Sequence, residues 1–272
     1  MRSWIAALTL TLSAPLLAQA SAEPSLDQQL TANMARGDLM YAYDQSAWHV
    51  TDAALGALPS DASAKLRGYV VTPDAAGYRT TLFGGEQGHY FRIYSAVWTG
   101  SDVRNAERFP LDGGASVTGE EARLIEARNV AMADAGELML CSKSPANTVV
   151  IPGATADDPI SVYVLTPQTR DGVYPLGGHN RRDVKDGKVV SSRAFTRGCI
   201  DFDAAAMMKG SAKGAKPVGM IITHLLDPVP TEIHAFSAHA AHLPIFVGVK
   251  SGAMFELGLK DGKATARQIA AK

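Results

Sequence analysis

Apolar and polar positions follow helical spacing near the start of the chain and extended spacing further along, and this change predicts an α+β protein. Ser25 and Gln28 form a capping-box pattern, and apolar residues recur at helical spacing from Leu26 to Met34. A second amphipathic stretch, 44–55, extends the helical region as far as Pro59. We therefore expect a helical N-terminal region.

From residue 67 the pattern is that of an antiparallel β-meander. Extended runs at 68–72, 78–83 and 90–98 are separated by Gly, Pro and Asp turn residues. A second capping-box pattern, Thr118 to Glu121, is followed by small residues at helical spacing, which is typical of a helix packed closely on a sheet. Gly136 is the predicted end of that helix.

A larger extended region follows Cys141 and completes the predicted fold. Two Asp-Gly pairs, Asp186-Gly187 and Asp261-Gly262, predict tight hairpins. The expected strands are 147–151, 160–166, 188–195, 218–225, 233–236, 245–249, 254–259 and 264–269. The predicted fold class is α+β, with antiparallel meanders packed on a few helices.

Two similar strings suggest an internal repeat. Residues Tyr69 to Pro73 are YVVTP and residues Tyr163 to Pro167 are YVLTP, and each string is followed by a Gly pair and a histidine. Two similar α+β halves would explain this order. The expected organisation is a signal peptide at 1–22, a helical N-terminus with the first meander at 23–115, and a helix with a second, larger antiparallel region at 116–272.

The first 22 residues have the pattern of a secretory signal peptide. Arg2 supplies a positive start, Ile5 to Leu17 is an uncharged apolar core, and Ala20-Ser21-Ala22 offers small residues for cleavage. No later stretch has the length of a transmembrane helix. We expect a soluble periplasmic or secreted protein that does not insert into a membrane after cleavage.

Composition and charge exclude several function classes. The chain is 46% hydrophobic and 19% charged with a net charge of −1, so it is a globular protein without the basic footprint of a nucleic-acid binder. The densest basic stretch, 181–197, contains Asp183 and Asp186 and is expected to be a solvated hairpin. Gly-rich nucleotide motifs and a G-x-S-x-G serine elbow are absent from the sequence, so we expect no cofactor.

Two cysteines, Cys141 and Cys199, are the only ones in the chain. In an oxidising compartment such a pair favours a disulfide over two free thiols. A bridge closing a loop of this length stabilises a fold by about 4 kcal/mol in the chain-entropy model. The sequence alone leaves the free-thiol alternative open.

The segment from 223 to 242 is the most site-like part of the sequence. It holds four of the seven histidines, and we select His224, Asp227, Glu232 and His234 as candidate binding residues. On a strand, Glu232 and His234 would share one face, so a metal-dependent hydrolase is one alternative, although no known zinc spacing is present. The other alternative is local hydrogen bonding in a proline-shaped turn.

A second constellation surrounds Cys199. Thr196-Arg-Gly-Cys-Ile200, with His179 upstream, resembles the cysteine motif of L,D-transpeptidases, exported enzymes that cross-link peptidoglycan through a cysteine acyl-enzyme. The resemblance implies Cys199 as nucleophile and His179 as its base. Asp201 takes the place of the family's arginine, and a carboxylate there raises the pKa of a neighbouring thiol.

A broader resemblance covers the C-terminal half, from about residue 147. Gly177-Gly-His179, Ser191-Ser-Arg193, and the stretch from His224-Leu-Leu-Asp-Pro228 into Pro230-Thr-Glu-Ile-His234 resemble segments of exported proteobacterial proteins without an assigned activity. This resemblance implies a shared fold and no mechanism.

Taken together, the residues favour a non-catalytic periplasmic binding, interaction or accessory protein. Its expected partner is a small molecule, a cell-wall component or another protein. The alternatives are a cysteine-dependent cell-wall transpeptidase-like enzyme and a metal-dependent hydrolase, and each lacks at least one element that its chemistry requires.

Overall fold

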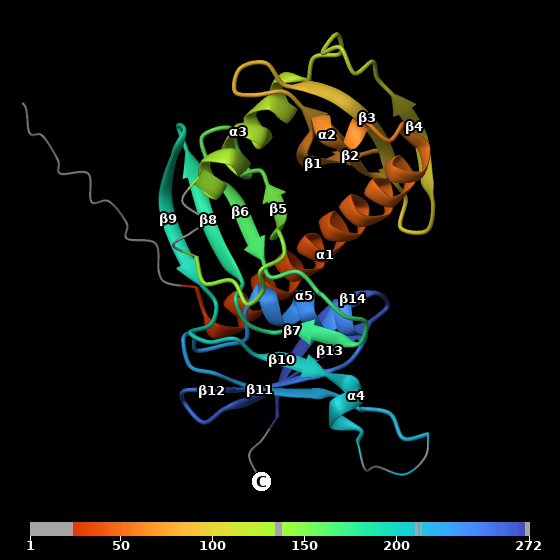
Figure 1. The fold of residues 1–272 in the computed structure, drawn as a ribbon. Coiled ribbons are helices and arrows are strands. Elements are labelled where there is room, and N and C mark those ends of the chain that lie inside the picture. The colour runs from red at the N-terminus through yellow and green to blue at the C-terminus, as the bar shows by residue number, and fades with distance from the viewer. Residues whose placement is uncertain (1–23, 134–137, 210–211, 213, 270–272) are drawn as a thin grey trace, which may run out of the picture.

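The computed structural model describes residues 24–133, 138–209, 212 and 214–269, and its longest element is helix α1 (Leu26–Ala57). The two helical stretches expected near the N-terminus are one continuous helix of 32 residues, which begins with the predicted capping box of Ser25 and Gln28. Helix α1 runs diagonally through the molecule and packs on elements at both of its ends (Figure 1). The proposed signal peptide lies outside the described residues.

The first sheet is an antiparallel meander in chain order, as predicted. A short helix α2 (Ala62–Lys65) precedes it, and its strands are β1 (Leu66–Asp74), β2 (Gly77–Gly84), β3 (Phe91–Trp98) and β4 (Val103–Arg108). The C-terminal half of α1 packs on this sheet through Val50 and Ala54, which contact a cluster with Leu82 and Ile93. Strand β4 was not predicted because nearly all of its residues are exposed and polar.

The second sheet is also an antiparallel meander, and helix α3 (Gly119–Ala133) joins it to the first. Its strands are β5 (Asn147–Ile151), β6 (Ile160–Leu165), β8 (Asn180–Lys185) and β9 (Lys188–Ala194). Leu124 and Ile125 of α3 lie in one cluster with Val70 of the first sheet and Val162 of the second. The predicted helix is confirmed, and its expected end at Gly136 lies outside the described residues.

Strand β8 corrects the expectation of a solvated basic hairpin. The Asp186-Gly187 turn forms as predicted, with both residues at positive φ. However, alternate residues of β8 face the interior, and Arg182 is buried with its guanidinium donating to the carbonyl of Ala131. The basic residues of this hairpin therefore make contacts inside the protein as well as with solvent.

The third sheet contains a parallel pair. Its strands are β11 (Met220–His224), β12 (Ile245–Val249), β13 (Met254–Lys260) and β14 (Lys263–Ile269), and β11 pairs in parallel with β12 through helix α5 (Glu232–Ala241). The strand predicted at 233–236 is wrong, because Thr231 caps a helix there and a parallel pair needs a crossover connection. The Asp261-Gly262 hairpin is confirmed.

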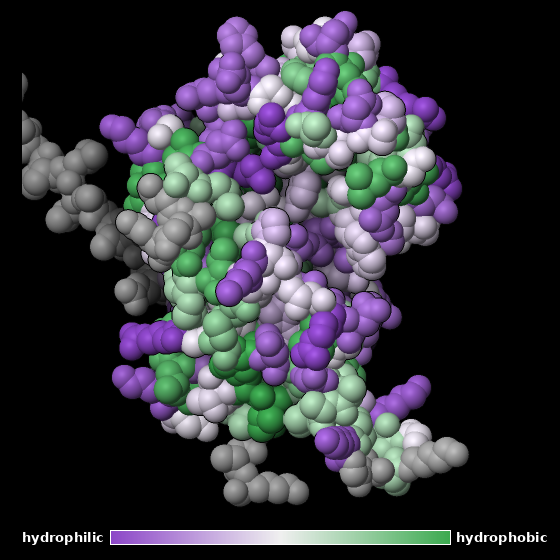
Figure 2. All heavy atoms as spheres, viewed as in Figure 1, coloured by the Kyte–Doolittle hydropathy of each residue, from purple (hydrophilic) through white to green (hydrophobic). Residues whose placement is uncertain are grey.

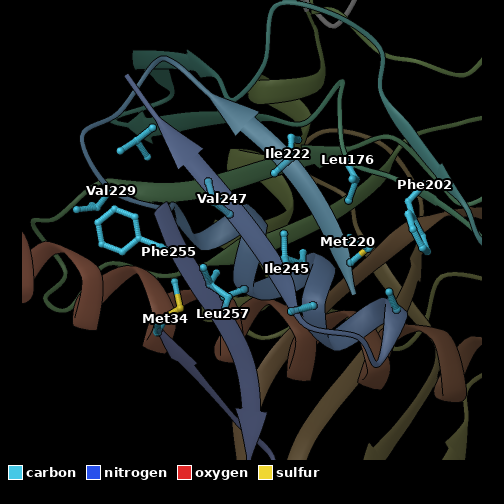
Figure 3. Packing of buried hydrophobic residues seen from close by; sticks show 14 residues of the cluster. Met34, Leu176, Phe202, Met220, Ile222, Val229, Ile245, Val247, Phe255 and Leu257 are labelled. Carbon is cyan, nitrogen blue, oxygen red and sulfur yellow. The ribbon is translucent and has the colours of Figure 1, made fainter. Parts of the chain in front are cut away.

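The core of this lower part joins the third sheet to helices α1 and α5. Met34 of α1 packs with Ile222, Val247 and Leu257 of the sheet (Figure 3). A small ribbon of β7 (Val173–Pro175) and β10 (Asp201–Asp203), followed by α4 (Ala204–Met207), contributes Phe202 to the same cluster. These helices and mostly antiparallel strands make an α+β fold, as predicted.

The two similar strings occupy different positions in their sheets. YVVTP lies on β1, the first strand of the first meander, whereas YVLTP covers the end of β6, the second strand of its own meander, and the two residues after it. Each half does contain a four-stranded antiparallel sheet. Helix α1 contacts both sheets as well as α5, so it links the two regions on either side of residue 115.

Candidate functional site

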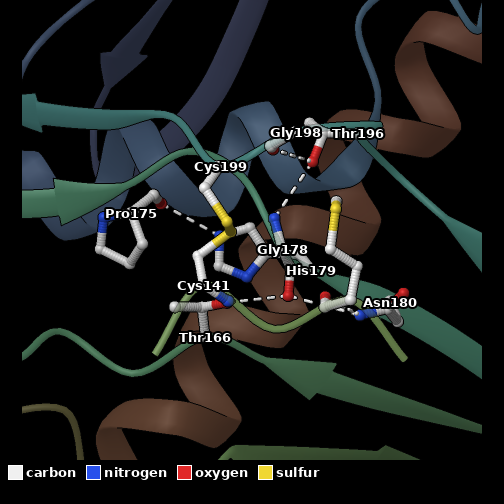
Figure 4. Close-up of a disulfide and its surroundings, with 10 residues drawn as sticks. Cys141, Thr166, Pro175, Gly178, His179, Asn180, Thr196, Gly198 and Cys199 are labelled. Carbon is white, nitrogen blue, oxygen red and sulfur yellow. Dashed lines mark hydrogen bonds between the residues drawn. A yellow bond between two sulfur atoms is a disulfide. The ribbon is translucent and has the colours of Figure 1, made fainter. Parts of the chain in front are cut away.

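The predicted disulfide is confirmed. The sulfur atoms of Cys141 and Cys199 are 2.09 Å apart, and their Cα atoms are 5.3 Å apart (Figure 4). Cys199 therefore has no free thiol in this structure, and the nucleophile of a transpeptidase-like reaction is missing. The bridge holds the loop around 199 to the segment that precedes β5.

His179 lies beside the disulfide in a structural setting. Its Nε2 donates to the carbonyl of Pro175 at 3.0 Å, and the side chain is 1% exposed. Burial lowers the pKa of His179, which keeps the ring neutral. Its Nδ1, which is then an acceptor, has no partner among the described residues.

Gly178 explains why the chain passes so close to the bridge. Its φ of +74° is in the left-handed region, and a Cβ there would lie 2.5 Å from Thr166 Oγ1 and 2.6 Å from Cys141 Sγ. Thr166 Oγ1 accepts from the Cys141 amide and donates to the Gly178 carbonyl. The Gly-Gly-His segment is thus required by packing at the disulfide.

Three of the four predicted binding residues, His224, Asp227 and His234, belong to one partly buried network. His224 Nε2 donates to Asp227 Oδ2 at 2.7 Å, and Arg193 of β9 donates to the same oxygen at 2.6 Å. Burial opposes ionisation of Asp227, but the hydrogen bond from His224 and the charge of Arg193 outweigh it, so the pKa of Asp227 lies below its ordinary value. This network ties β9 to the loop between β11 and α5.

His234 caps the start of α5. Its Nδ1 accepts from the backbone N–H of Thr231 at 3.0 Å, and its ring meets the His224 ring edge-on at a centroid distance of 4.7 Å. Burial and the neighbouring His224 lower the pKa of His234 to about 3. The ring is neutral at physiological pH and serves as a structural cap.

Glu232 belongs to a different network, although it is two residues from His234. Its Oε1 accepts from the hydroxyl of Tyr163 and from Arg181, each at 3.1 Å, and Arg36 of α1 donates to the same Tyr163 hydroxyl. These contacts join α1, the second sheet and α5. The helix turns the Glu232 and His234 side chains into separate networks, whereas the predicted strand would have placed them on one face.

The remaining histidines of the segment also have structural contacts. His239 Nε2 donates to Asp38 of α1 at 2.7 Å, and Asp38 also accepts from the Ala264 amide. His242 ends α5 in the left-handed conformation with φ of 51°. Within the described part of the chain, His, Cys, Asp and Glu side chains nowhere gather in threes so that they could hold a metal ion.

A crevice of about 930 Å³ lies elsewhere in the described part of the structure. Helix α1, strand β1, the segment 165–175, which includes β7, and the second half of α5 supply most of its walls, with Asn147 of β5 beside them. Figure 2 shows the surface hollowed at mid-height on this face, with hydrophilic residues inside. Five aromatic residues line the crevice, namely Tyr41, Trp48, Tyr69, Tyr174 and Phe236.

Asp44 is a carboxylate of the crevice wall whose pKa is shifted. Burial raises its pKa to about 6, although a hydrogen bond from Gln45 opposes the shift. The pKa values of the Tyr41 and Tyr69 hydroxyls are raised first by burial and then by the negative charge of Asp44. Asp44 makes no ion pair with any residue that the structure describes. It therefore presents a partly desolvated carboxylate to the crevice.

Two buried polar atoms of the crevice wall are unsatisfied. Thr51 Oγ1 and His179 Nδ1 are buried atoms without a hydrogen-bond partner among the described residues, and both residues line the crevice. Native proteins rarely leave such atoms unpaired, so this is a typical sign of a ligand or ordered water. Trp48, 56% exposed, continues the wall outward and stacks on His49, which stacks on Trp98.

Of the residues selected from the sequence, only His179 lines this crevice. A signal for the others was present in α1, where Tyr41, Asp44, Gln45, Trp48 and Asp52 recur at intervals of three and four residues. Such spacing places these aromatic and polar residues on one stripe of the helix. In a helix that is packed against the core elsewhere, this stripe indicates a surface with a purpose beyond packing.

No family model matches the chain, and neither a curated protein nor a solved structure is similar to it. Among the residues that the structure describes, no helix combines the length and the hydropathy needed to cross a membrane. Because the comparisons found no match, the function of the site is interpreted from its own geometry.

Proposed function

We propose that this chain is an exported, non-catalytic binding protein whose ligand occupies the crevice between α1, β1, the segment 165–175 and α5. The observation that carries the proposal is the crevice itself, which has the size of a small-molecule site and buries polar atoms without partners. The secretory pattern of residues 1–22 and the disulfide support export.

The networks around His224 and Glu232 support a binding role for the crevice rather than a catalytic role for the histidine segment. Asp227, Glu232 and His234 are each engaged by neighbouring side chains or backbone, so they are not free to transfer protons to a substrate. The disulfide removes the thiol of the cysteine-enzyme alternative. The described residues also lack the ligand set of the metal-hydrolase alternative.

Occlusion of the crevice tests the proposal. Ala240 lines the crevice near the end of α5, and Ala240→Phe would fill part of it. The matched control is Ala32→Phe on the exposed side of α1. The probes are peptidoglycan fragments, neutral oligosaccharides and aliphatic amines, with the rise in melting temperature as the readout.

The proposal predicts that at least one probe class stabilises the wild type and the Ala32→Phe variant but not Ala240→Phe. The absence of any stabilising probe would refute it, and so would stabilisation that Ala240→Phe leaves unchanged.

A further inference from the structure

The charges that line the crevice favour a cationic ligand. Three carboxylates, those of Asp44, Asp52 and Asp171, line the crevice together with one guanidinium, that of Arg170, which lies 3.6 Å from Asp203. An anionic ligand would meet an excess of negative charge with its only arginine already engaged. A protonated amine would be attracted by this excess of negative charge.

The hydrogen-bonding groups point the same way. An ionised Asp44 only accepts hydrogen bonds, and the free Nδ1 of His179 is an acceptor because Nε2 already donates to Pro175. His179 is 1% exposed, so this unpaired acceptor is part of a built wall and not of a mobile surface. An ammonium group carries only donors and therefore complements both acceptors.

The aromatic residues add a second attraction for a cation. Tyr41, Trp48 and Tyr69 line the crevice together with Asp44, and Trp48 is exposed four residues further along α1. The faces of aromatic rings attract cations, most strongly when the cation is desolvated. A carboxylate among aromatic rings is the combination by which proteins hold organic ammonium groups.

We propose that the crevice selects a ligand with an organic ammonium group, with Asp44 as its counter-ion and Tyr41, Tyr69 and Trp48 as the surrounding rings. This inference rests on the proposed function, since it names the ligand class of the same crevice. The ammonium group has two sources of similar chemistry, an aliphatic amine and an amino sugar.

Paired probes isolate the charge from the shape of the ligand. Cadaverine is compared with 1,5-pentanediol, and glucosamine with glucose, by isothermal titration calorimetry at about pH 7, where Asp44 is mostly ionised. In at least one pair, the amine should bind at least about tenfold more tightly than its neutral partner. The pair that responds identifies the source of the ammonium group.

The variant Asp44→Asn tests the counter-ion, and Asp157→Asn, an exposed carboxylate outside the crevice, is the matched control. Asp44→Asn should weaken amine binding at least about tenfold, whereas Asp157→Asn should change it less than about twofold. Neutral partners that bind as well as the amines, amines that bind Asp44→Asn unchanged, or the absence of binding by both amines would each overturn the inference.

The two proposals fail in different ways. A neutral probe that binds the wild type, is blocked by Ala240→Phe and is insensitive to Asp44→Asn would leave the crevice as a binding site and overturn only its ammonium selectivity. If no probe of any class responds to the occlusion of the crevice, both proposals fail together.

Discussion

Gly37 of α1 lies so close to Ala235 of α5 that a Cβ atom on Gly37 would be 2.4 Å from the Ala235 Cβ. The same Cβ would be 2.6 Å from the carbonyl oxygen of Glu232. The backbones of the two helices therefore meet directly at this crossing. The contact places the first turn of α5, with Glu232 and His234, against the middle of α1.

We expect Gly37→Ala to destabilise the protein by about 1–3 kcal/mol, because the added methyl group forces the helices apart. The gain in helix propensity, about 0.5–1 kcal/mol, offsets only part of this cost. Gly56 is the matched control, because it lies in the same helix and a Cβ there meets nothing within 4 Å. Urea unfolding should show Gly37→Ala less stable and Gly56→Ala unchanged or more stable. Equal effects at both positions would contradict the tight crossing.

The disulfide links residues 58 positions apart, and its removal should lower stability markedly. For the double variant Cys141→Ser/Cys199→Ser we expect a loss of about 2–5 kcal/mol, since the unfolded chain regains the entropy of a long open loop. The measurement is the urea midpoint with and without reductant. Reductant should destabilise the wild type but leave the double variant unchanged. Wild-type protein whose intact mass shows two free thiols would contradict the bridge.

His234 should make the folded state sensitive to acid. Its pKa is lowered to about 3, mainly by burial and then by His224, while an unfolded histidine titrates near 6.5. Between these values the unfolded chain binds a proton that the folded chain does not, so stability falls as the pH decreases through this window. The limiting slope is about 1.4 kcal/mol per pH unit.

The variant His234→Asn isolates this effect, because its carboxamide oxygen can accept the Thr231 N–H without titrating. Relative to wild type, the free energy of unfolding of His234→Asn should rise steadily as the pH is lowered from about 6.5 to about 4.5. Exposed His89→Asn serves as the control and should run parallel to wild type. A His234→Asn curve that also runs parallel would mean that His234 titrates normally in the folded protein.

The sequence predicted those features of the fold that depend on residues close together in the chain. The Ser25 capping box, the Asp186-Gly187 and Asp261-Gly262 hairpins and most strand positions follow from contacts between near neighbours in the sequence. The Cys141–Cys199 bridge followed from the expected compartment and the cysteine count. The run 233–236 was misassigned because a short apolar segment has no period of its own that separates a strand from a buried helix.

The sequence did not predict those features that depend on contacts between residues far apart in the chain. Arg181 is a surface residue by composition, yet its partner Glu232 lies 51 positions away and draws it inward. The crevice combines residues from 41–52, 69, 147, 165–179 and 236–242, and no single segment contains enough of it to be recognised as a site. Of the crevice, the sequence contains only the stripe of aromatic and polar residues on α1 as a signal. The structure was needed to show what this stripe faces.

Asp44 gives the most specific prediction about the crevice. A carboxylate that is kept for a ligand should lower the stability of the folded protein when no ligand is bound. Burial raises its pKa to about 6 from an unfolded value near 3.8, so the unligated protein loses stability as the pH rises from about 4 to about 6. We expect Asp44→Asn to be about 1–2 kcal/mol more stable than wild type at pH 8, after allowance for partial exposure, and nearly equal at pH 4. The groups that share the crevice with Asp44, namely Tyr41, Tyr69, Asp52, Asp171, Arg170, His179 and His242, are present in both proteins, so the difference between the two unfolding curves reports Asp44.

Asp157→Asn should show no such pH-dependent gain. A variant that is less stable than wild type at pH 8 would mean that the Asp44 carboxylate already has a stabilising partner. If the gain is observed, Asp44 lowers the stability of the empty protein, as expected of a carboxylate kept for a ligand.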